Sequence, residues 1–92
     1  MALGNFGLII SYLVRFLDLS KEQENIILTN RAKFTKALSP IYQKLDFDDS
    51  LCDKCIKMLD ENIAYELKID DRIFKKAIKL AIIMFFDKNC IN

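Results

Sequence analysis

Residues 69–86 read IDDRIFKKAIKLAIIMFF, and the pattern changes halfway along this stretch. The first half is amphipathic, whereas Leu80–Phe86 is a run of seven apolar residues. At ~3.6 residues per turn, such a run makes about two helical turns, so its side chains point in every direction. A helix that is apolar all round is buried on all sides. The pattern therefore predicts a C-terminal helix that is either the central post of the fold or partly covered by another chain.

The first half of the chain has clear signals for helix starts and stops. Apolar residues recur at helical spacing over 4–17, with a wide apolar arc. Ser20 and Gln23 match a capping box, which predicts a second helix over 21–38. Ser39 precedes Pro40, a residue favoured at the first position of a helix, so we expect a stop here and then a short third helix.

The second half of the chain continues the helical pattern. A polar loop at 46–50 offers Asp and Ser residues as caps for a fourth helix over 51–67. Asp70 is expected to cap the last helix. No segment combines two-residue alternation with strand chemistry. Since the predicted connections are short, we expect an all-α fold: a compact four- to five-helix bundle in one domain, residues 1–92, with the C-terminal helix central.

Composition limits the class of protein. The chain has 92 residues, 52% of them apolar, and a net charge of +1. This apolar content is high for a soluble chain of this size and favours self-association or a partner-binding face. Residues 1–14 are uncharged, but they are too short to cross a membrane, which takes about 20 residues, and they lack secretory-signal features. Three cysteines without such a signal suggest a reducing, cytoplasmic compartment. Abundant isoleucine and lysine with scarce arginine hint at an AT-rich genome, such as that of a phage or virus.

The sequence offers little for catalysis. Histidine, the commonest general acid–base and nitrogen ligand, is absent. No glycine-rich phosphate loop and no nucleophile–base pair is recognisable. We therefore expect a protein that is not an enzyme and has no cofactor, no metal and no catalytic residue.

Cys52 and Cys55 form a CxxC motif, which can be a redox pair, part of a zinc site or a pair of core residues. A redox pair belongs at a helix start, and Cys52 is predicted to lie in the first turn of its helix. The strands of a thioredoxin-like context are missing, and a zinc site needs four ligands. The simpler interpretation is that both cysteines are small core residues on the apolar face of a helix.

Charge is segregated along the chain. Residues 46–71 carry three basic and nine acidic side chains, whereas the segments on either side are net basic. We consider two interpretations. In the first, an acidic helix packs beside basic neighbours; in the second, residues 46–71 offer an acidic docking surface to a basic partner.

A basic stripe on the last helix predicts which apolar residues face outward. If the stripe faces water, Ile83 and Phe86 continue it and need a cover, while Leu80 and Met84 lie in the core. The stripe consists of Arg72, Lys75 and Lys79.

These patterns favour a small protein-interaction module, with a regulatory or accessory role. It is expected to self-associate as a homodimer, or to bind a partner helix, through the apolar faces of its first and last helices. The residues predicted to form this interface are Phe6, Ile10, Leu13, Ile83 and Phe86.

Nucleic-acid binding is the alternative function. Lys33, Lys36 and Lys44 form a basic stretch, and the predicted helices around Ser39-Pro40 loosely imitate a helix-turn-helix. The small net charge gives little electrostatic attraction to a phosphate backbone, so this remains the second hypothesis.

Overall fold

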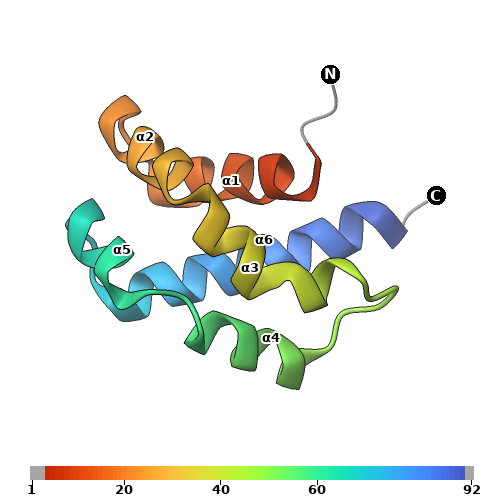
Figure 1. Cartoon of the computed structure of the whole chain (residues 1–92). Coiled ribbons are helices and arrows are strands. Elements are labelled where there is room, and N and C mark those ends of the chain that lie inside the picture. The colour runs from red at the N-terminus through yellow and green to blue at the C-terminus, as the bar shows by residue number, and fades with distance from the viewer. Residues whose placement is uncertain (1–3, 91–92) are drawn as a thin grey trace.

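The computed structural model describes the backbone of residues 4–90 and the side chains of residues 6–87. Within these ranges the chain is entirely helical, which confirms the predicted all-α class (Figure 1). The radius of gyration is 12.3 Å, close to the ~12 Å expected of a compact domain of this length. The described residues form six helices, where four or five were expected: α1 Gly4–Leu17, α2 Lys21–Thr29, α3 Arg31–Tyr42, α4 Asp49–Lys57, α5 Glu61–Leu67 and α6 Asp71–Cys90.

The long helix α6 organises the molecule. It packs against α1, α4 and α5, and in Figure 1 it runs below α1 in the opposite direction. Helix α3 crosses between α1 and α4, and α2 packs against α3 and α5. At the centre of the core, the ring of Phe34 lies edge-on to Phe6 and Phe74, with centroids 5.9 and 6.3 Å apart. Among the described residues, no helix has the length and apolarity that a membrane span requires.

The capping signals identified the starts of α2, α4 and α6. Ser20 and Gln23 form the expected capping box at the start of α2. Asp48 accepts a hydrogen bond from the Leu51 N–H at the start of α4, and Asp70 caps α6 through the Arg72 N–H. These bonds satisfy N–H groups that have no partner inside their own helix.

Two predicted helices are each divided in two. The helix expected over 21–38 breaks at Asn30, and the one expected over 51–67 breaks before Asp60, which caps α5. The predicted stop at Ser39-Pro40 is wrong, because α3 continues through both residues to Tyr42. The missing N–H of Pro40 falls in the last turn of α3, where it interrupts little of the helix. The helix-turn-helix-like arrangement is therefore not formed.

Helix α6 is buried on most of its circumference but not on all of it. Leu80 is 47% exposed, so its predicted place in the core is wrong, whereas Met84 is partly buried against the core. Phe86, predicted to face outward, is only 5% exposed and packs against Phe47, with ring centroids 6.1 Å apart. Ile83 does face outward and is 37% exposed.

The contacts of the basic stripe explain why α6 exposes Leu80 and buries Phe86, the reverse of the prediction. The ammonium Nζ of Lys79 lies 2.7 Å from Asp49 and 3.0 Å from Asp53, both on α4. Lys75 pairs with Asp71 at 2.9 Å within α6 itself. Part of the stripe therefore lies beside acidic α4 instead of facing open water, which turns Phe86 inward and Leu80 outward.

Candidate functional site

A groove of about 750 Å³ lies between α1 and α2. Its apolar lining comes mainly from one side of α1, with Leu28 of α2 opposite, and Leu28 is 46% exposed. Charged side chains of both signs line the remainder of the groove. An apolar surface with a few charged groups around it is typical of a recognition site. The lining residues are Phe6, Gly7, Ile10, Ser11, Val14, Arg15, Asp18, Glu24, Leu28 and Arg31.

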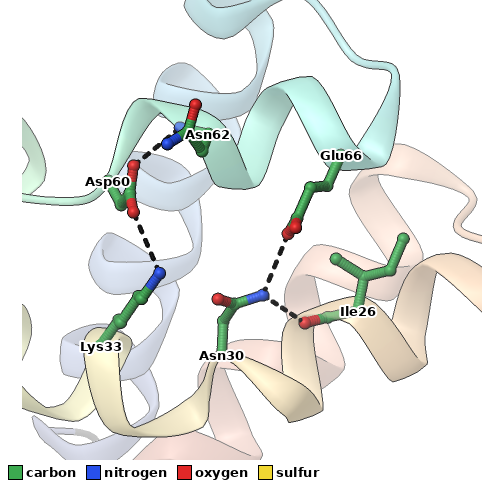
Figure 2. A network of polar contacts seen from close by, with 6 residues as sticks. All are labelled: Ile26, Asn30, Lys33, Asp60, Asn62 and Glu66. Carbon is green, nitrogen blue, oxygen red and sulfur yellow. Dashed lines mark hydrogen bonds and ion pairs between the residues drawn. The ribbon is translucent and has the colours of Figure 1, made fainter.

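Helix α2 borders this groove because it is held against α5. The side-chain amide of Gln23 donates a hydrogen bond from Nε2 to the carbonyl oxygen of Leu67, over 2.8 Å. At the other end of α2, the amide of Asn30 donates to the Ile26 carbonyl, at 2.8 Å, and to the Glu66 carboxylate, at 3.4 Å (Figure 2). Both ends of α2 are thus tied to α5, and Leu28 is not covered by α1.

The two ends of the groove carry different charges. The guanidinium carbon of Arg31 lies 5.6 Å from the centroid of the Phe6 ring, at the N-terminal end of α1. At the opposite end, Asp18 follows the last residue of α1, and Glu24 lies in the first turns of α2. Arg15 lies one turn before Asp18, so the acidic end also contains one cation. The groove is therefore positively charged at the Arg31 end and mainly negatively charged at the Asp18 end.

The five predicted interface residues do not form one surface. Phe6 and Ile10 line the groove between α1 and α2, although only a small fraction of each is exposed. Leu13 is fully buried, so it cannot contact a partner in the folded state. Ile83 and Phe86 line a second, shallow pocket of about 300 Å³, which also includes Phe47 and Asp87.

Two of the three lysines of the nucleic-acid hypothesis lie beside acidic side chains. Lys33 pairs with Asp60 over 3.0 Å (Figure 2), and Lys44 lies 4.0 Å from Asp48. The pKa of Asp60 is lowered, first by a hydrogen bond from the Asn62 N–H and then by Lys33. Lys36 is exposed on α3. Two of the three cations are therefore partly neutralised within the chain.

The cysteines of the CxxC motif are core residues in the folded protein. Cys52 and Cys55 are both buried and not in a disulfide. Burial raises the pKa of Cys52 to about 11, and it also raises the pKa of Cys55. The nucleophile in thiol chemistry is the thiolate, so both groups are in the unreactive form near neutral pH. Among the described residues, no group of three or more potential ligands is placed to hold a metal ion.

The acidic segment packs beside basic residues of α6. Asp49 and Asp53 on α4 share the ammonium group of Lys79, and these hydrogen bonds raise the pKa of Lys79. This geometry favours complementary packing over a free acidic docking surface for this part of residues 46–71.

Sequence patterns did not indicate the α2 side of the groove. Nothing in the sequence around Leu28 shows whether the first helix would cover this side chain. The wide apolar arc of residues 4–17 was the one available signal, and it pointed to the α1 side.

Comparison with protein-family models, with curated proteins and with solved structures finds no match to this chain.

Proposed function

We propose that this chain is a small, non-enzymatic protein-interaction module that binds an amphipathic helix of another protein in the groove between α1 and α2. The observation that carries this proposal is the partly exposed apolar side chain of Leu28, opposite the apolar side of α1 and ringed by charges. Helix-in-groove binding uses this combination: apolar anchors fill the groove and charged groups around it set the orientation.

The size of the groove fits a short helix. From Phe6 to Asp18 the axis of α1 extends for about 18 Å, at ~1.5 Å per residue. A ligand helix of about twelve residues, or three turns, spans that length. Its apolar side chains would recur at i, i+4 and i+7, the spacing that places them on one face.

The charges define the direction of the bound helix. The N-terminus of a helix carries partial positive charge and its C-terminus partial negative charge. Asp18 and Glu24 therefore favour the ligand's N-terminus, together with a basic side chain there, while Arg31 favours its C-terminus and an acidic side chain. The proposed occupant is thus an amphipathic helix with basic residues in its first turn and acidic residues in its last.

Site-specific photo-crosslinking in the source cells tests this proposal. A photoreactive amino acid is placed at Leu28 and, as a matched control, at Met58, an exposed apolar position outside the groove. We expect position 28 alone to crosslink to a segment with the stated apolar spacing and charges. Crosslinks of equal yield at position 58, or a crosslinked segment without helical apolar spacing, would show the proposal to be wrong.

A further inference from the structure

We propose that the outward face of α6 pairs with the same face of a second copy of this chain, in antiparallel orientation. The face is separate from the groove between α1 and α2, so this inference does not rest on the proposed function. Three of its members are large apolar side chains that remain substantially exposed: Ile73 at 56%, Leu80 at 47% and Ile83 at 37%. We call it the α6 stripe, and its residues are Ile73, Lys76, Leu80, Ile83 and Asp87.

The spacing of the α6 stripe is that of a coiled-coil seam. Its members follow one another at intervals of three and four residues in the order 3, 4, 3, 4 from 73 to 87. This spacing places side chains in one line along a helix, as at the a and d positions of a heptad. Lys76 and Asp87 are also exposed, so the whole line is accessible to a partner.

The α6 stripe is complementary to itself when reversed. With a two-fold axis between residues 81 and 82, Leu80 of one copy lies opposite Ile83 of the other. In the same register Lys76 lies opposite Asp87. Each contact occurs twice, because the two copies present the same patch to each other. Apolar side chains thus meet at the centre, and a pair of opposite charges lies on each side of them.

Charge favours this orientation over the parallel one. A parallel pair would place Lys76 beside Lys76 and Asp87 beside Asp87, and like charges at an interface are unfavourable. Two other cations of α6 already have partners: Lys75 pairs with Asp71, and Lys79 with α4. Within the part of the chain that the structure describes, neither Lys76 nor Asp87 has an ion-pair partner, so both are available to a second copy.

The surface beside the α6 stripe has room for the second copy. The shallow pocket of about 300 Å³ is bordered by Ile83 and Asp87 and floored by Phe47 and Phe86. The antiparallel register places Leu80 and the aliphatic stem of Lys76 from the second copy over this pocket. The pocket and the charge pattern therefore indicate the same occupant.

Charge reversal combined with sedimentation equilibrium tests the pairing. Wild type is expected to be a reversible dimer, and Lys76→Asp or Asp87→Lys alone to raise the dissociation constant by about tenfold or more, since each places like charges together. The double variant Lys76→Asp/Asp87→Lys restores opposite charges and is expected to dimerise like wild type. Lys57→Asp, at an exposed position of α4, is the control and should leave the dimer intact.

Mixing the two single variants gives a second, independent readout. One copy then carries two acids and the other two lysines, so a heterodimer is expected to form more tightly than either homodimer. A wild type that stays monomeric at its highest soluble concentration would overturn the inference. A double variant as weakly associated as the singles, or a mixture without heterodimer, would overturn it equally. Circular dichroism of each variant shows whether it is folded, and the groove test at Leu28 is unaffected by either result.

Discussion

At the scale of single residues, Tyr42 carries a hydroxyl group whose burial is not compensated. Its oxygen is buried and has no hydrogen-bond partner among the described residues, while its ring packs against Phe85 at 6.2 Å. A buried polar group without a partner costs free energy, and the cost is removed when an apolar group of the same shape replaces it. The ring of Tyr42 thus contributes packing, and its hydroxyl lowers stability.

Tyr42→Phe is therefore expected to raise the free energy of unfolding by about 1 kcal/mol in urea titrations at pH 7. Burial raises the pKa of Tyr42 to about 12 from its ordinary value of 10.0. Because the pKa of Tyr42 is higher in the folded state, the unfolded chain loses this proton first. The free energy of unfolding of the wild type is therefore unaffected by this group below pH 10 and falls as the pH rises from 10 toward 12. The advantage of the variant should therefore grow over that interval. Tyr65→Phe, at a highly exposed position, is the control, and an unchanged or lower stability of Tyr42→Phe would contradict this view.

The two buried cysteines lead to a second prediction at this scale. With a pKa of about 11 for Cys52, very little thiolate is present at pH 8. Iodoacetamide should modify Cys52 and Cys55 far more slowly than it modifies a cysteine in a short peptide, as measured by peptide mass spectrometry over time. The rate should rise in urea as the chain unfolds. If either residue of the folded protein were alkylated as fast as a cysteine in a short peptide, the result would support the redox interpretation.

At the scale of helices, the features that depend on local hydrogen bonds were predicted, and those that depend on long-range contacts were not. Ser20 and Asp70 could be assigned as caps, and the cap of α4 could be placed in the loop at 46–50 that contains Asp48, because a cap bonds within three residues of itself. The break at Asn30 could not be predicted, because the Asn30 side chain also bonds to Glu66, a residue 36 positions away. Local sequence patterns do not show contacts between residues that are distant in the sequence. The groove between α1 and α2 also depends on such contacts, so it could not be predicted either.

The ends of α1 and α5 fall at Leu17 and Leu67, as predicted, although no glycine marks either end. Asp18 and Lys68 both have positive φ, 50° and 59°, and follow α1 and α5 respectively. The next N–H in each case, Leu19 or Ile69, bonds to a carbonyl five residues back, which closes the helix. Glycine is the usual residue at such positions, so the prediction of these two ends rested on the extent of the apolar helical pattern and not on Asp18 or Lys68.

Gln23 provides a test of how α2 is held. Its Oε1 accepts the Ser20 N–H at 2.9 Å, and its Nε2 donates to the Leu67 carbonyl. Gln23→Ala removes both bonds and should lower the free energy of unfolding by about 2 kcal/mol. Gln23→Glu keeps the acceptor for Ser20 but loses the donor to Leu67, so roughly half of that loss is expected. Urea unfolding measures both, and equal losses for the two variants would show that the bond to α5 is the one that matters.

Lys79 connects α4 to α6, and its contribution depends on pH. Hydrogen bonds to Asp49 and then Asp53 raise its pKa above the ordinary 10.5. The stabilisation is therefore complete below pH 10.5 and is lost as the pH rises through the higher folded-state value. Lys79→Gln should be less stable than wild type at pH 7, and this difference should shrink in alkaline solution. Lys54→Gln, an exposed position of α4, is the control, and a pH-independent difference would contradict the ion-pair account.

At the scale of the whole molecule, the helices of the described residues enclose a core and leave the groove between α1 and α2 and the α6 stripe exposed. The sequence indicated that the last helix carries more apolar surface than a free surface helix would, and the exposed Leu80 and Ile83 agree with this. It misplaced the open face, because the ion pairs of Lys79 with α4 settle the rotation of α6 and form only in the folded chain. The second open surface, the groove, depends on where α5 holds α2.

The central claim is that this groove binds a helix of another protein. The segment crosslinked at position 28 is synthesised as a labelled peptide and titrated with wild type, Leu28→Asp and Met58→Asp, and fluorescence anisotropy reports its binding. Wild type and Met58→Asp are predicted to bind the peptide equally, and Leu28→Asp at least about tenfold more weakly, because a charge then lies in the apolar floor. Equal affinity of the peptide for all three proteins would contradict the claim.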